Sequence, residues 1–140
     1  MSYHYSVMRA RIRMKRVKLF IHEPLINKVV GRDLDLLLND RASLVGAISE
    51  VDKIINSKGN FPVPNYRSLL HMIYNPVENR FYKQVAITAY NQSGQMMNMR
   101  DDPKKELPEG TTVTLIPAGG CITDWEEAIN YEEFLKSTSY

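Results

Sequence analysis

The chain has 140 residues, enough for one domain with a modest core, and a formal net charge of +2. Its single cysteine excludes an internal disulfide and a zinc site built on paired cysteines. The sequence contains no run of about 18 apolar residues, so it predicts no membrane span. No apolar segment of the kind found in signal peptides follows the basic N-terminal residues, and we expect a reducing, cytoplasmic setting.

Charge is unevenly distributed along the chain. Residues 9–18 contain six basic side chains and no acidic one, whereas residues 121–140 contain five acidic side chains and one lysine. A basic stretch can contact nucleic-acid phosphates, and the candidates for such contacts are Arg9, Arg11, Arg13, Lys15 and Arg16. The same charges can instead keep a strand edge from aggregating or attract the acidic end of the chain. We favour a protein partner over nucleic acid.

Two strands are expected in the first third of the chain. Apolar and basic residues alternate from Met8 to Met14, and a second alternation runs from Val17 to Ile21. The phase slips by one residue at Lys15–Arg16, which predicts a β-bulge or two successive strands. Leucines alternate again from Leu34 to Leu38 and predict the next strand.

One amphipathic helix follows these strands. From Leu44 to Ile55 the apolar residues are spaced three and four apart, as on one face of a helix. Asp40 is the expected N-cap and Gly59 the expected C-cap.

The second half is expected to be mainly strands. Leu69–Tyr74 and Arg80–Tyr90 are apolar and aromatic runs joined by a turn at residues 75–79, and they predict an antiparallel pair. A short strand at 96–100 and a last strand at Thr111–Ile116 follow. A capping box at residues 123–126 predicts a further helix near the end of the chain.

The order of the elements predicts an α+β fold. Two strands, one helix and then further strands lack the alternation that forces a doubly wound parallel sheet. One helix of about three turns can cover one face of a mixed four- or five-stranded sheet, which is the β-grasp architecture. We expect this domain to span residues 15–120, between a basic N-terminal extension, 1–14, and an acidic helical extension, 121–140.

Residues 85–120 resemble the small subunit of molybdopterin synthase and related ubiquitin-like sulfur carriers. Val85–Asn91 is similar to a core strand of that family, and Leu107–Gly110 to its Leu-x-x-Gly turn. Val113–Pro117 is similar to the last strand, and Gly119–Gly120 stands where the family has its terminal diglycine.

The sequence departs from the family pattern at three points. Thr111 stands where the family usually has an aspartate, and only Ala118 separates Pro117 from the diglycine. The chain also continues past Gly120 for twenty residues. Only a C-terminal carboxylate can be adenylated, so the resemblance implies processing between Gly120 and Cys121.

The resemblance implies a non-enzymatic sulfur carrier or protein modifier that acts through the carboxylate of Gly120 after residues 121–140 are removed. It implies an adenylating enzyme and a processing protease as partners, with no bound cofactor or metal. Phe20 and Ile116 are the expected partner surface. The alternatives are an uncleaved β-grasp interaction module or accessory subunit, which could form a homo-oligomer, and a small nucleic-acid-binding protein.

Overall fold

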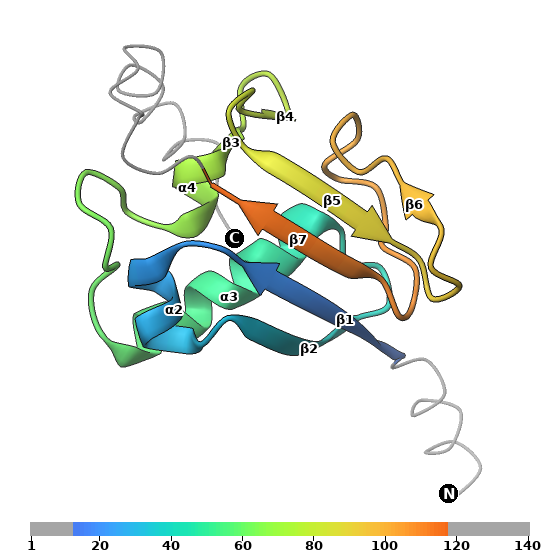
Figure 1. Cartoon of the computed structure of the whole chain (residues 1–140), viewed down its shortest axis with the longest axis horizontal. Coiled ribbons are helices and arrows are strands. Elements are labelled where there is room, and N and C mark those ends of the chain that lie inside the picture. The colour runs from blue at the N-terminus through green and yellow to red at the C-terminus, as the bar shows by residue number, and fades with distance from the viewer. Residues whose placement is uncertain (1–12, 118–140) are drawn as a thin grey trace, which may run out of the picture.

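A computed structural model describes residues 13–117 of the chain (Figure 1). Its centre is one five-stranded sheet with the order β2-β1-β7-β5-β6. The neighbouring strands β1 and β7 are parallel, and the other neighbouring strands are antiparallel. The chain therefore has an α+β fold with a mixed sheet, as predicted, and the strand order is compatible with a β-grasp. The strands are β1 (Met14–Ile21), β2 (Asp33–Asn39), β5 (Ala86–Tyr90), β6 (Met96–Met97) and β7 (Thr112–Ile116).

The long helix α3 (Leu44–Lys58) packs on one face of this sheet and crosses behind the strands in Figure 1. The predicted helix is confirmed, but its N-cap is Ser43 and not Asp40. The Ser43 hydroxyl accepts a hydrogen bond of 3.2 Å from the amide of Gly46. Gly59 ends the helix with a φ of 142°, a conformation that residues with a side chain rarely adopt.

The core lies between α3 and the inner face of the sheet. Alternate residues of each strand point inward because successive side chains of a strand face opposite sides. The inward side chains of β1, β2 and β7 are almost wholly apolar. They include Val17, Leu19, Ile21, Leu36, Leu38, Val113 and Leu115.

No bulge interrupts β1, and the predicted slip at Lys15–Arg16 is wrong for this strand. The register with β2 is unbroken from the pair Met14–Asn39 to the pair Phe20–Asp33. The alternation stays in phase because Lys15 takes an inward position, where only 2% of its surface is exposed. A lysine in an inward position resembles a phase slip in the sequence, since hydropathy alone assigns it to the solvent face.

A short helix, α2 (Pro24–Val30), connects β1 to β2 and was not predicted. Pro24 occupies the first turn, where its missing amide hydrogen is tolerated. The Glu23 carboxylate accepts a hydrogen bond of 2.7 Å from the amide of Ile26. Pro24 therefore both ends the strand and begins a helix.

The prediction of a strand at Leu69–Tyr74 is wrong, because Leu69–Ile73 forms the helix α4. The strands β3 (Tyr74–Asn75) and β4 (Arg80–Phe81) then form a separate two-stranded hairpin. The predicted strand Arg80–Tyr90 is accordingly divided, with a turn between β4 and β5.

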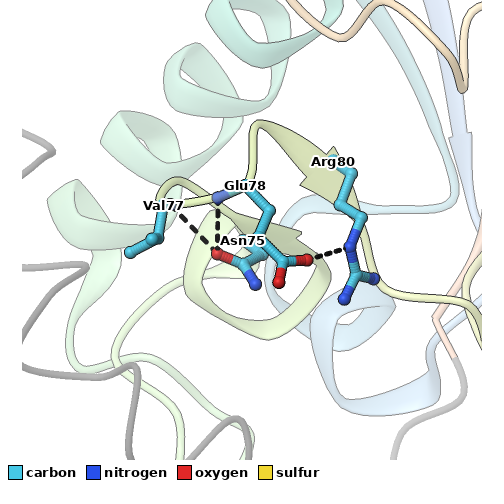
Figure 2. A network of polar contacts seen from close by, with 4 residues as sticks. All are labelled: Asn75, Val77, Glu78 and Arg80. Atoms are coloured by element: carbon cyan, nitrogen blue, oxygen red, sulfur yellow. Dashed lines mark hydrogen bonds and ion pairs between the residues drawn. The ribbon is translucent and has the colours of Figure 1, made fainter.

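The expected turn at residues 75–79 is present in this hairpin. The buried Asn75 lies at the start of this turn (Figure 2). Its Oδ1 accepts hydrogen bonds from the amides of Val77 and Glu78 at 3.0 and 3.1 Å. Glu78 also forms an ion pair with Arg80. The turn is therefore stabilised by an asparagine side chain that substitutes for a backbone acceptor.

Candidate protein-interaction face

The face of the sheet opposite α3 is covered by no described element, and we call it the open sheet face. It consists of the outward residues of the five strands. Five of the seven large apolar side chains that are exposed in residues 13–117 belong to it. These are Met14, Leu37, Tyr90, Met96 and Ile116, with exposed fractions of 48, 57, 38, 71 and 47%.

Both residues expected at a partner surface lie on this face. Phe20 is half-buried on β1, opposite Asp33 on one side and Thr114 on the other. Ile116 is the next outward residue of β7 after Thr114, and it lies opposite Ala86 of β5. The sheet thus brings Phe20 and Ile116, which are far apart in sequence, onto neighbouring strands.

Charged side chains of β1 and β2 lie among these apolar residues. Lys18 lies opposite Asp35, one row away from the Phe20–Asp33 pair. Lys18, Phe20, Asp33 and Asp35 line a shallow depression together with Leu34. An exposed face on which apolar and charged side chains lie side by side is compatible with a protein-binding site.

Lys15, one of the predicted nucleic-acid contacts, is not available for that role. Its ammonium donates hydrogen bonds to the carbonyls of Asp40, Ala42 and Leu107 at 2.8, 2.7 and 2.5 Å. Burial lowers the pKa of Lys15, and the negative charges of Asp40, Glu106 and Glu109 oppose that shift. The ammonium connects the turn before α3 with the turn before β7 instead of facing solvent.

The other predicted basic contacts are only partly described. Arg13 and Arg16 are exposed, and Arg16 points to the open sheet face opposite Leu37. Arg9 and Arg11 lie outside the described residues. Of the five predicted nucleic-acid contacts, Lys15 is therefore buried, and only Arg13 and Arg16 are exposed among the described residues.

Two buried titratable side chains lie near the junction of α3 and α4, Asp52 on α3 and His71 on α4. No pattern in the sequence pointed to Asp52. The Asp52 carboxylate of α3 accepts hydrogen bonds from the amides of Leu69 and Leu70 at 2.7 and 3.0 Å. Burial raises the pKa of Asp52 to about 6, although the two amides oppose that shift. Its role is to cap α4 from another helix.

His71 lies in the first turn of α4 and is 5% exposed. Its Nδ1 accepts a hydrogen bond of 3.2 Å from the amide of Arg67, and its ring contacts that of Tyr66 edge-on. Burial, together with the charge of Arg67, lowers the pKa of His71 to about 4. These contacts give His71 a structural role in holding the start of α4.

Residues 13–117 contain no group of three or more histidine, cysteine, aspartate or glutamate side chains that could hold a metal ion. Within the same part of the chain, no helix is long and apolar enough to cross a membrane. The predicted diglycine and the processing position, Gly119, Gly120 and Cys121, lie outside the described residues.

Comparisons of the chain with models of protein families, with curated proteins and with solved structures find no match.

Proposed function

We propose that the chain is a ubiquitin-like β-grasp protein of the sulfur-carrier or modifier type, which acts through the carboxylate of Gly120 after residues 121–140 are removed. The observation that carries this proposal is the position of β7. It is the central strand, lies parallel to β1, and ends at Ile116, three residues before Gly119. In the sequence, the diglycine follows this strand after only Pro117 and Ala118, and the strand is paired on both sides.

The chemistry of this proposal lies in the partner enzyme and not in this chain. The Gly120 carboxylate attacks the α-phosphate of ATP, which releases pyrophosphate and leaves an acyl adenylate. A sulfur or amine nucleophile then displaces AMP. Glycines suit the tail because they have no side chain to obstruct entry into the active site of the partner.

The intact mass of the protein isolated from its own cells tests this proposal. We expect a species that ends at Gly120, with a second species in which one carboxylate oxygen is replaced by sulfur if the protein is a sulfur carrier. A single species that ends at Tyr140 would contradict the proposal, because an internal glycine has no carboxylate to activate.

A second candidate is an uncleaved interaction module on the same fold, and the apolar side chains of the open sheet face favour it. Ile116→Lys would place a charge near Phe20 and reduce the amount of partner that copurifies with the full-length chain. Val77→Lys is the matched control, because Val77 is exposed to a similar extent, 56%, but lies in the β3–β4 hairpin. Equal partner recovery with both variants would argue against the open sheet face as the docking surface.

A further inference from the structure

The outer edge of β2 has backbone groups that no residue in 13–117 pairs. β2 is the terminal strand of the sheet, with β1 as its neighbour. Hydrogen bonds from Ile21 to Arg32 and from Asp40 to Arg13 bracket the antiparallel ladder. Because hydrogen-bonded pairs alternate along such a ladder, the backbone N–H and C=O groups of the even-numbered residues of β2 point towards β1. The N–H and C=O groups of Asp33, Asp35 and Leu37 therefore point away from the sheet.

This edge lacks most of the features that prevent strand pairing in other proteins. β2 contains no proline and no lysine, and its register with β1 shows no bulge. Its inward side chains are leucines, Leu34, Leu36 and Leu38. The acidic side chains of Asp33 and Asp35 lie on the open sheet face and not in the path of an incoming strand.

We propose that β2 pairs antiparallel with β2 of a second copy of this chain, about a two-fold axis that passes through Leu36. Asp35 then lies opposite Leu37 of the second copy, and Asp33 lies opposite its Asn39. The two sheets join into one continuous sheet, and the open sheet faces of both copies lie on the same side. This interface does not depend on the function proposed above, because β2 is two strands away from β7.

Hydrogen bonding and charge together select this register. Among the described residues, both outer backbone groups of Asp33, Asp35 and Leu37 are unpaired, whereas Asn39 offers only its N–H, because its carbonyl accepts a hydrogen bond of 2.9 Å from the amide of Ala42. These odd-numbered residues must therefore lie opposite one another. An axis through Asp35 would place its carboxylate opposite the Asp35 carboxylate of the second copy, and like charges in opposite positions are destabilising. An axis through Leu37 would leave Asp33 beyond the paired region. The axis through Leu36 places each acid opposite a neutral residue. It pairs Asp35 with Leu37 through both of their backbone groups, and Asp33 with Asn39 through the Asn39 N–H.

The basic residues of β1 balance the acids of the interface. Lys18 lies opposite Asp35 within each sheet, and Arg16 lies opposite Leu37. Across the interface, one row of the joined sheet therefore reads Lys18, Asp35, Leu37, Arg16, and the next row reads the reverse. Each copy contributes two acids and two bases, so association brings no net charge together. Strand-edge interfaces are small, and we expect a weak dimer that depends on concentration.

Sedimentation equilibrium of the full-length chain over a wide concentration range tests the dimer, and Leu37 tests its register. Leu37→Lys places a cation opposite Asp35 of the second copy and is expected to lower the Kd about fivefold, since two symmetric contacts change together. Leu37→Asp places like charges opposite each other and is expected to raise the Kd by a similar factor.

The same variants have the opposite effect within one copy, which separates association from folding. Leu37 lies opposite Arg16 in its own sheet, so Leu37→Asp is expected to favour the folded monomer while Leu37→Lys disfavours it. Met96→Lys is the control, because Met96 is an exposed apolar residue of the open sheet face on β6, at the other end of the sheet.

Several results would overturn the proposal. A monomer at every concentration removes the interface altogether. Weaker association with both Leu37 variants would contradict the proposed register. A weaker dimer with Met96→Lys would assign the contact to the open sheet face. A chain that remains monomeric but binds an extended basic peptide at β2 would assign the edge to a peptide partner instead.

Discussion

Lys15 shows how one side chain can connect two turns that are distant in the sequence. Its position among the inward residues of β1 is unfavourable by hydropathy, and burial lowers the pKa of its ammonium. Three carbonyls from residues 40, 42 and 107 compensate, and they belong to the turn before α3 and the turn before β7. A buried charge is tolerated where every donor has an acceptor. The sequence could not indicate this, because the three acceptors are backbone atoms with no residue signature.

Replacement of Lys15 by methionine is expected to lower the free energy of unfolding by about 3 kcal/mol at neutral pH. Methionine fills similar space but leaves the buried carbonyl of Leu107 and the partly buried carbonyl of Asp40 without that donor. Urea denaturation measures the change. Lys18→Met is the control, since Lys18 is an exposed residue of the same strand on the opposite face, and its effect should stay within about 0.5 kcal/mol. Equal stability of the two variants would show that the Lys15 ammonium holds nothing in place.

At the scale of elements, α4 explains where sequence reasoning failed. Leu69–Tyr74 is a short apolar run, and periodicity alone cannot distinguish a buried strand from a buried helix of this length. Contacts from outside the run decide the outcome. The Ser68 hydroxyl accepts a hydrogen bond of 2.9 Å from the amide of His71, and Asp52 receives the amides of Leu69 and Leu70. Ser68 is a visible cap signal in the sequence, whereas Asp52 is seventeen residues away from Leu69.

Asp52→Ala is expected to destabilise the protein by about 2 kcal/mol, because it leaves two buried amides at the start of α4 without an acceptor. Asp52→Asn keeps one oxygen acceptor and removes the buried charge, so its loss should be smaller. Thermal or urea denaturation at pH 7 compares the two variants. Glu50→Ala is the control, since Glu50 lies on the same helix and pairs with the exposed Lys53. A larger loss for Asp52→Asn than for Asp52→Ala would contradict the capping role.

At the scale of the whole molecule, the sequence predicted the class of fold and most of the central sheet. Alternation in β1, β2 and β7 and the spacing in α3 each identify an element because each has one apolar face. The connections were predicted less well. Pro24 ends a strand in the sequence pattern, but it also begins the helix α2, which the pattern did not predict. Arg100 stabilises the turn between β4 and β5 by donating hydrogen bonds to the carbonyls of Tyr82, Lys83 and Val85. These features depend on contacts between segments that no local pattern records.

The candidate interaction face was predicted only in part, for a related reason. Phe20 is conspicuous because it breaks the alternation of β1 with a large apolar side chain, and Ile116 follows from its place on the last strand. Leu37, Tyr90 and Met96 gain significance only from the strand order, which places them on the same side of one sheet. Pairing between strands that are distant in sequence is the information that single-strand patterns lack.

Asp52 and His71 together are expected to change the free energy of unfolding little between pH 7 and pH 4, because their separate pH dependences have opposite signs and overlap in this range. The pKa of His71 is about 4 in the folded protein and 6.5 in an unfolded chain, so its stabilisation is complete above pH 6.5 and is lost as the pH falls towards 4. The pKa of Asp52 is about 6 in the folded protein and 3.8 in an unfolded chain, so its contribution increases as the pH falls from 6 towards 3.8. Each effect corresponds to about 3 kcal/mol.

Separate replacement of the two residues should reveal the opposing slopes. With Asp52→Asn, only His71 remains, and stability should fall between pH 7 and pH 4. With His71→Asn, only Asp52 remains, and stability should rise over the same range. Urea denaturation at several pH values measures both, and the double variant provides the baseline for every other titrating group. The difference from that baseline is expected to reach about 3 kcal/mol in each direction. Single variants that both follow the baseline would mean that neither side chain is held in its buried state, and the junction of α3 and α4 would then have to be looser than its hydrogen bonds indicate.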